Sequence, residues 1–379
     1  MKVLIVSNNY YLRGNGVCTA VQALRSRLLE KGIDVRILAC ENSEAGGAQP
    51  DYPLKHFKFP VFEPIIKANG YRYPQVDKTV IRKAVEWADV IHLMEGFPLQ
   101  STAARIASKL GKPCVGTYHI FTDNITANLE IGYDTFVNRL INKWWSSSVY
   151  NHCTSVQCPT TKVKEHLEKN GYTSQLRVIT NGIELSEPVK SDFDPHTRPY
   201  RILCTGRLSN EKSQITLLEA MKHSRYASEI EIHFAGNGPK AKKIKNAARK
   251  LYNNGILTHQ TLFGFYSANE LRQMAADSYL YIHCAIVEVE GLSCLEAIQQ
   301  GTVPIIAESD LSATSQFALD QRSLFKARDP KDLAQKIDWW IEHPEERAAM
   351  GRQYSESVKK YDAADSTAKI IEMYEEAIG

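Results

Sequence analysis

The stretch 279–307, YLYIHCAIVEVEGLSCLEAIQQGTVPIIA, decides the fold. It opens with a short apolar run, passes through a turn at Gly291, continues with a helical stretch and ends in a second apolar run. Strand, helix and strand in this order are typical of a βαβ unit in a parallel sheet.

The same alternation extends along the chain on both sides of this stretch. Apolar runs of strand length, bounded by turn residues, alternate with amphipathic stretches of helical length, which predicts parallel sheets covered by helices. The predicted strands are 2–7, 34–39, 88–93, 113–119, 155–160 and 176–182 in the first half, and 200–206, 229–236, 259–265, 279–285, 302–307 and 323–327 in the second.

A Pro- and Asp-rich stretch without periodicity, LSEPVKSDFDPHTRPY at 185–200, separates the two series of strands. A chain of 379 residues exceeds the usual size of one core, so two domains are expected. We predict an N-terminal Rossmann-like domain over 1–185, a linker over 186–198, and a second Rossmann-like domain over 199–355. The helix predicted over 356–379 either caps the second domain or crosses back to the first.

Composition indicates a folded, soluble protein, with 43% apolar and 23% charged residues. The N-terminal apolar run is too short for a signal peptide and no window is long enough for a membrane span, so we expect a cytoplasmic protein. The eight cysteines are scattered and form no CxxC pair, which favours buried free thiols. Residues 1–185 hold 22 Lys and Arg against 16 Asp and Glu, leaving 24 against 27 in the rest. This asymmetry fits an anionic partner of the first half or a solvated basic face equally well.

Two cations follow the first strand of the second domain, in TGRLSNEKS. Open α/β sheets bind ligands at the carboxyl ends of their strands, where Arg207 and Lys212 are predicted to lie. A guanidinium and an ammonium group there can clamp a diphosphate. The alternative is that both are ordinary surface cations.

The turn in the quoted stretch is a second candidate binding element. Gly291, Leu292 and Ser293 begin a helix whose amides can hold phosphate, and Glu296, one turn inside, can accept both hydroxyls of a ribose. Glu288 precedes the helix and is predicted to face whatever lies beyond the phosphates. Gly14 and Gly16, between the first predicted strand and helix, form a weaker candidate, since any tight turn uses Gly.

Taken together, these residues resemble the retaining nucleotide-sugar glycosyltransferases of family four, which have the GT-B fold. The family's E-x7-E element matches Glu288 to Glu296, and its Arg-to-Lys element matches Arg207 and Lys212. Further matches, in the order of the family, are His119, the hinge Asn181-Gly182-Ile183, the G-x-G-P turn Gly236–Pro239 with Gly238, and the aromatic-Gly turn at Phe263-Gly264-Phe265.

The resemblance implies two Rossmann-like domains facing each other across a cleft, with a UDP-sugar as donor. It implies catalytic roles for His119, Arg207, Lys212 and Glu288. The donor-binding residues would be Gly16, Arg207, Lys212, Gly238, Phe265, Glu288, Gly291, Leu292, Ser293 and Glu296. One departure is that Val289 and Glu290 follow Glu288, where the family often has Pro and Phe. Glu290 is expected to add a negative charge beside the sugar.

The EVEGLSCLEA segment looks most similar to glycolipid-forming members, which transfer a hexose to diacylglycerol or ceramide. Residues 55–83 hold seven cations against two acids, interleaved with aromatic and aliphatic side chains. This pattern suits an anionic bilayer surface as well as it suits a surface helix with its apolar face in the core. The membrane or acceptor candidates are Lys55, Lys58, Phe62, Ile66 and Lys67, and the protein would be peripheral on the inner face of the cell membrane. The Trp144-Trp145 pair is interpreted as core.

No metal, cofactor or nucleic-acid partner is expected. Asp192-Phe193-Asp194 matches a metal-binding D-x-D by letter but lies in the linker, not after a strand. Three alternatives to lipid glycosylation stay open: a glycosyltransferase with a soluble or polysaccharide acceptor, a sugar-nucleotide epimerase, and a non-enzymatic module that binds a membrane surface.

Overall fold

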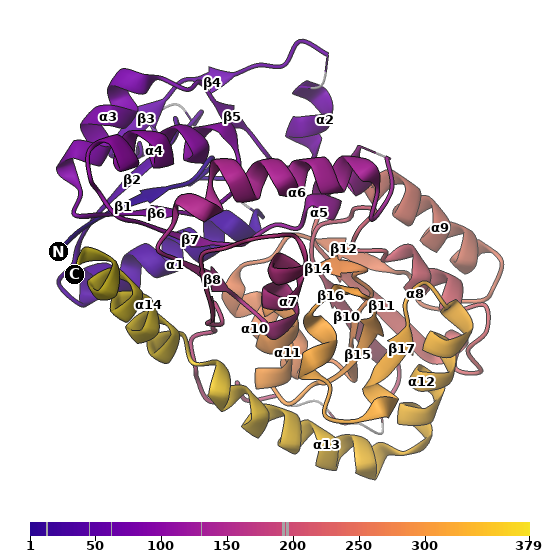
Figure 1. Ribbon diagram of the computed structural model, residues 1–379. Helices are drawn as coiled ribbons and strands as arrows, with labels where there is room; N and C mark the ends of the chain where they lie inside the picture. The colour runs from indigo at the N-terminus through magenta and orange to yellow at the C-terminus, as the bar shows by residue number, and fades with distance from the viewer. Residues whose placement is uncertain (13, 45, 62, 130, 192–193, 195–196) are drawn as a thin grey trace. The chain divides into compact units, whose positions relative to one another are not determined.

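The computed structural model describes residues 1–379 except 13, 45, 62, 130, 192–193 and 195–196 (Figure 1). It divides into two compact units. Unit 1 comprises Met1–Asn181 together with Ala363–Gly379, and unit 2 comprises Gly182–Asp362. The break therefore lies between Asn181 and Gly182, four residues before the predicted end of the first domain.

Unit 1 is built on a seven-stranded sheet in the order β3-β2-β1-β6-β7-β8-β9, in which all neighbours are parallel. The order reverses beside β1, as in doubly wound nucleotide-binding folds. All six strands predicted for the first half are present, and β3 was missed. The strands are β1 (Lys2–Val6), β2 (Asp34–Cys40), β3 (Tyr52–Leu54), β6 (Val90–Leu93), β7 (Cys114–Thr117), β8 (Ser155–Cys158) and β9 (Gln175–Val178).

Helices connect these strands, and most of them bury one face against the sheet. Asn15 caps the first helix by accepting from the amides of Val17 and Cys18, so the helix begins at Gly16. The helices of unit 1 that precede Asn181 vary in length. They are α1 (Gly16–Glu30), α2 (Glu63–Ala68), α3 (Lys78–Trp87), α4 (Pro98–Lys109), α5 (Thr122–Asn128), α6 (Phe136–Ser148) and α7 (Thr161–Lys169).

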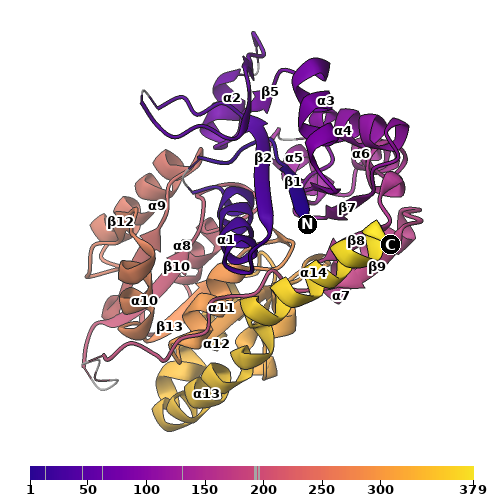
Figure 2. The ribbon, with the colours of Figure 1, turned by 90° about the vertical axis from the view of Figure 1, so that its left-hand side faces the viewer.

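The last helix, α14 (Ala363–Ile378), belongs to unit 1 and packs on α1, β6, β7 and β8 (Figure 2). Ile370, Met373 and Tyr374 enter the same apolar core as the strands. The Tyr374 hydroxyl lies 2.7 Å from Nδ1 of the buried His92. Unit 1 is thus completed by the end of the chain.

Unit 2 repeats the architecture with a six-stranded parallel sheet in the order β12-β11-β10-β13-β15-β17. Each of its strands was predicted. They are β10 (Tyr200–Thr205), β11 (Ile230–Ala235), β12 (Leu262–Gly264), β13 (Leu280–His283), β15 (Val303–Glu308) and β17 (Leu324–Lys326). The connecting helices are α8 (Ile215–Ala220), α9 (Ala241–Asn253), α10 (Ala268–Ala276), α11 (Leu292–Gln299), α12 (Pro330–Glu342) and α13 (Pro344–Ser357).

Four very short strands lie outside the main sheets and were not predicted. In unit 1, β4 (His56–Phe57) pairs with β5 (Tyr73–Pro74), and in unit 2, β14 (Val287–Glu288) pairs with β16 (Leu311–Ser312). The eight cysteines are free and buried, as expected. In the described part of the chain, no helix has both the length and the hydropathy that crossing a membrane requires.

Candidate active site

Arg207 and Lys212 lie in the loop that follows β10, at the carboxyl end of the unit 2 sheet. Each is paired with a carboxylate. Arg207 Nη2 donates to Oε1 of the buried Glu211 at 2.5 Å, and the Lys212 ammonium group forms an ion pair with Glu288. Because both side chains remain partly exposed, they are held in place and still accessible to an anion.

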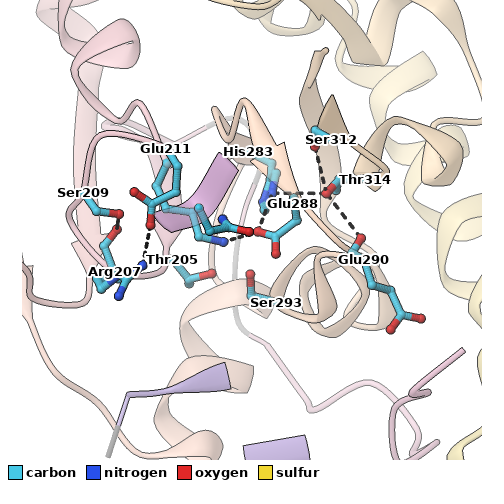
Figure 3. Close-up of polar contacts among 12 residues, drawn as sticks. Thr205, Arg207, Ser209, Glu211, His283, Glu288, Glu290, Ser293, Ser312 and Thr314 are labelled. Atoms are coloured by element: carbon cyan, nitrogen blue, oxygen red, sulfur yellow. Dashed lines mark hydrogen bonds and ion pairs between the residues drawn. The ribbon is translucent and has the colours of Figure 1, made fainter. Parts of the chain in front are cut away.

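Glu288 is the centre of this cluster (Figure 3). Its carboxylate pairs with Lys212, and Oε2 lies 3.6 Å from Nε2 of the buried His283. Burial alone would raise the pKa of Glu288, but the Lys212 charge and the His283 hydrogen bond outweigh it and lower the pKa to about 2. Burial lowers the pKa of His283, with Glu288 opposing the shift. Glu288 is therefore an anion at neutral pH.

A chain of hydrogen bonds extends from this cluster beneath the end of the sheet. The Tyr281 hydroxyl lies 2.8 Å from Thr205 Oγ1 and 3.1 Å from Ser293 Oγ. His283 Nε2 lies 3.3 Å from Thr314 Oγ1, which also donates to the Glu290 carbonyl oxygen. The network ties β10, β13 and the start of α11 together.

The start of α11 adopts a conformation that only glycine takes without strain. Gly291 has φ +92°, and a Cβ built there would lie 2.5 Å from Thr314 Oγ1. Leu292 and Ser293 supply the first amides of the helix, where anions are stabilised. The amide of Cys294 donates to the Gly291 carbonyl oxygen at 2.8 Å, so this amide is used within the helix.

Other residues predicted to bind the donor also lie in unit 2. The Gly238 backbone packs closely on the Arg207 loop, because a Cβ there would lie 2.5 Å from the Leu208 carbonyl oxygen. Phe265 follows β12 with 63% of its surface exposed. Glu296 is on α11 with an exposed side chain. Glu290 differs from expectation: it is buried, and its carboxyl group points away from Glu288 (Figure 3).

Two of the predicted site residues, Gly16 and His119, lie in unit 1. Gly16 is the first residue of α1, where a Cβ would meet nothing within 4 Å, so packing does not demand glycine there. His119 follows β7 and is half-buried. In the part of the chain that the structure describes, its Nε2 has no hydrogen-bond partner.

The cationic segment 55–83 lies on the surface of unit 1. Lys55, Lys58 and Lys67 are exposed and Ile66 is half-buried, whereas Phe62 lies outside the described residues. The remaining aromatics do not all face solvent. Their rings pack against one another, either T-shaped or tilted, in a cluster that anchors the segment. The ring contacts are Phe57–Phe59, Phe59–Tyr73, Tyr71–Tyr73 and Tyr73–Phe97.

The Trp pair of α6 was predicted to be core, which is correct for Trp145 and wrong for Trp144. Trp145 is 2% exposed and Trp144 is 41% exposed. The two side chains leave the helix about 100° apart, so only one can face inward. In the D-x-D match, residues 192 and 193 lie outside the described part of the chain. Among the residues that are described, no cluster of His, Cys, Asp or Glu has the geometry of a metal site.

Sequence reasoning missed the groups that hold the site together, namely Glu211, Tyr281, His283 and Thr314. Glu211 lies between the two predicted cations, and its position in SNEKS was the only available signal. Tyr281 and His283 alternate along the buried strand β13 and look like core residues in sequence. Their role emerges only when β13, β14 and residue 314 are brought together.

Comparison with known proteins identifies the chain as a glycosyltransferase. A glycosyltransferase of Methanocaldococcus jannaschii, itself uncharacterised, is 26% identical and covers 99% of this chain and 98% of its own length. The crystal structure of Anabaena HepE with UDP-glucose matches with a TM-score of 0.74 at 15% identity, covering 99% of this chain and 100% of that one. The catalytic domain of a cholesterol-α-glucosyltransferase from Helicobacter pylori is 47% identical and covers 43% of this chain and 99% of its own, with a TM-score of 0.41.

Two family models divide the chain between them. The model described as Glycosyltransferase Family 4 matches residues 14–187, and that described as Glycosyl transferases group 1 matches residues 188–356. Their common edge falls near the break between the two units. With nearly the whole chain matched and two parallel-sheet units in GT-B order, the protein belongs to the family-four-like glycosyltransferases of the GT-B fold.

Proposed function

We propose that this enzyme transfers a hexose, with retention of the anomeric configuration, from UDP-glucose or UDP-galactose to a membrane lipid such as diacylglycerol or ceramide. The observation that carries the donor half of the proposal is the Lys212–Glu288–His283 cluster at the start of α11. It combines a cation, a fixed carboxylate and helix amides at the carboxyl end of a parallel sheet, where such folds bind ligands.

In the proposed reaction, the bond between the sugar C1 and the diphosphate oxygen breaks and the leaving group takes the electron pair. The acceptor hydroxyl oxygen attacks C1 from the same face, and its proton passes to the departing diphosphate. Arg207, Lys212 and the amides of Leu292 and Ser293 stabilise the charge that develops on the diphosphate. Glu288 orients the sugar hydroxyls, and His119 is proposed as a further sugar-contacting residue.

The uridine part of the donor is assigned to the other exposed groups of the unit 2 site. Glu296 on α11 offers a carboxylate to the ribose hydroxyls, and Phe265 offers an exposed ring at the end of β12. HepE, which resembles this chain in fold, has been solved with UDP and with UDP-glucose, and this supports UDP as the carrier. The proposed donor site uses no metal ion.

The lipid half of the proposal is supported by the surface of unit 1. The exposed Lys55, Lys58 and Lys67 accompany Phe57, Val61 and Ile65, which are all among the exposed large apolar side chains. Helix α2 buries none of its residues. A cationic and apolar surface of this kind suits an anionic bilayer, and this supports the proposal that the protein is peripheral on the inner face of the cell membrane.

The test is a panel of radiolabelled sugar nucleotides offered with a total lipid extract, followed by partition into organic solvent and chromatography. We expect label from one UDP-hexose in a neutral glycolipid, and none with Arg207→Ala. Label found only in water-soluble material would refute the lipid acceptor and leave the donor site intact. Conversion of the donor alone into an isomeric sugar nucleotide would identify an epimerase.

A further inference from the structure

Helix α6 is amphipathic in the reverse sense of an ordinary surface helix. Its buried residues are Asn138, Asn142, Trp145 and Ser146, three of which are polar. Large apolar side chains stand at exposed positions, with Phe136 71%, Leu140 51% and Trp144 41% exposed. These three residues are spaced four apart and form one stripe along the helix.

The polar inner face is fully engaged, so the helix is not placed backwards. Asn138 Nδ2 donates to Thr122 Oγ1 at 3.2 Å and to Thr126 Oγ1 at 2.9 Å, which joins α6 to α5. Asn142 Oδ1 accepts from the Tyr118 hydroxyl at 3.3 Å. Buried amides with partners of this kind are satisfied and specify one orientation. The outward direction of the apolar stripe is therefore fixed by the fold.

The stripe is part of a larger apolar surface, here called the α6 surface. It comprises Leu129, Ile131, Phe136, Val137, Leu140 and Trp144, which are six of the nineteen exposed large apolar side chains among the described residues. Phe136, Leu140 and Trp144 lie on one face of the same helix, and a row of large exposed apolar side chains marks an interaction surface, because isolated exposed apolar residues are normal but contiguous groups are not.

The charges on this helix favour one partner. Arg139 and Lys143 are exposed beside the stripe, and residues 136–148 contain no Asp or Glu. Trp at the edge of an apolar stripe and basic residues alongside it suit the boundary between lipid head groups and acyl chains. We propose that the α6 surface inserts into the interfacial region of an anionic bilayer, which rests on the proposed lipid-glycosylating function.

This contact is distinct from the one that residues 55–83 make. Residues 55–83 offer exposed lysines, among them Lys55, Lys58 and Lys67, and attract the surface by charge, whereas α6 offers a rigid apolar stripe with two cations. Through Asn142 and Tyr118, the same network reaches the residue next to His119. In this proposal, insertion of α6 sets the distance between the loop that carries His119 and the acceptor lipid in the bilayer.

The first experiment is cosedimentation with phosphatidylglycerol vesicles of the Leu140→Gln/Trp144→Gln double variant. Burying a large apolar side chain favours binding by on the order of tenfold, so we expect affinity to fall by more than tenfold. Leu29→Gln is the matched control, because Leu29 is similarly exposed in unit 1 on α1 and should not change affinity. Equal affinity of the wild type and the double variant would overturn the proposal.

The second experiment needs no loss of binding. Trp144→Phe keeps the stripe apolar, so it should bind vesicles as the wild type does. Vesicles with brominated acyl chains should quench wild-type tryptophan fluorescence. Trp144→Phe should lose most of that quenching, because Trp145 and Trp340 are buried and Trp87 and Trp339 are half-buried, while Trp144 is exposed on the α6 stripe. Quenching that is the same in both proteins would show that Trp144 does not enter the bilayer.

Two further outcomes separate this inference from the proposed function and from a different occupant. A wild-type dimer that the double variant converts to monomer would assign the α6 surface to a second copy and overturn the membrane proposal. If the double variant transfers sugar normally to acceptor lipid in detergent micelles but poorly in vesicles, the proposal is supported. If no lipid is glycosylated in either system while the quenching persists, the proposed acceptor is wrong and the membrane contact stands.

Discussion

The two units use their charged residues in opposite ways. Residues 1–185 carry the excess of positive charge and the remainder carries the excess of negative charge. Yet Arg207 and Lys212, the cations best placed to bind a diphosphate, belong to unit 2, while Lys55, Lys58 and Lys67 of unit 1 lie on an open surface. The net charge of a domain therefore does not locate an anion site, because a few fixed charges at a sheet end decide binding.

The largest effect should follow from removing a fixed cation of unit 2. We expect Arg207→Ala and Lys212→Ala each to lower kcat by about two to three orders of magnitude, the usual loss on removing one group that stabilises a developing oxyanion. Steady-state kinetics with the preferred sugar nucleotide provides the measurement. Lys222→Ala is the control, since Lys222 pairs with Glu219 on the surface of the same unit and should leave kcat unchanged. Near-normal turnover in either test variant would refute the diphosphate clamp.

The open cations of unit 1 should act on location and not on the donor. Each Lys near an anionic surface contributes on the order of 1 kcal/mol, so replacing Lys55, Lys58 and Lys67 by Glu should weaken vesicle binding by well over tenfold. Affinity for UDP, measured by calorimetry on the same protein, should not change. Unchanged vesicle binding would retire this docking segment, and a parallel loss of UDP affinity would mean that the triple change damages the fold.

Gly291 of unit 2 and Gly16 of unit 1 differ in how much space a side chain would have. Gly291→Ala forces a side chain into φ +92° and against Thr314, so we expect a loss of about 1–3 kcal/mol in the free energy of unfolding. Gly16→Ala enters a helix start with open space around it, so stability should change by less than about 0.5 kcal/mol. Urea denaturation measures both.

The Gly16 variant also tests a ligand role that stability cannot show. If the backbone at Gly16 approaches the sugar, turnover should fall in Gly16→Ala although its unfolding curve matches the wild type. Wild-type turnover together with wild-type stability would reduce Gly16 to an ordinary helix start.

The strands could be predicted because each is a short apolar run between turn residues, and this pattern depends on local sequence alone. Strands such as β14 and β16 have two residues each and no pattern to detect. The first helix shows a different limit. Leu28 and Leu29 are both apolar, yet Leu28 is buried and Leu29 is 47% exposed, because the packing partner decides which side of a weakly amphipathic helix faces inward.

The site residues likewise fall into those that a sequence motif predicts and those that it does not. Arg207, Lys212 and Glu288 stand in recognisable motifs, and two of them meet in an ion pair as neighbours in a site should. His283 and Thr314 contact across segments far apart in sequence, so no spacing rule could find them. Helix α6 could not be read correctly from sequence, since a search for apolar faces assigns Leu140 and Trp144 to the core.

The smallest expected effect concerns metal ions. In the proposed reaction the charge on the leaving diphosphate is stabilised by Arg207, Lys212 and the α11 amides, the role that a divalent cation fills in other sites. Activity in saturating EDTA should therefore equal that in buffer with Mg²⁺. Arg207→Ala sharpens the comparison, because a site that has lost one cation has more to gain from an added one, and partial rescue of this variant by Mg²⁺ is expected. Complete loss of wild-type activity in EDTA, restored by Mg²⁺ or Mn²⁺, would show that the two cations and the helix start do not suffice to stabilise the departing diphosphate.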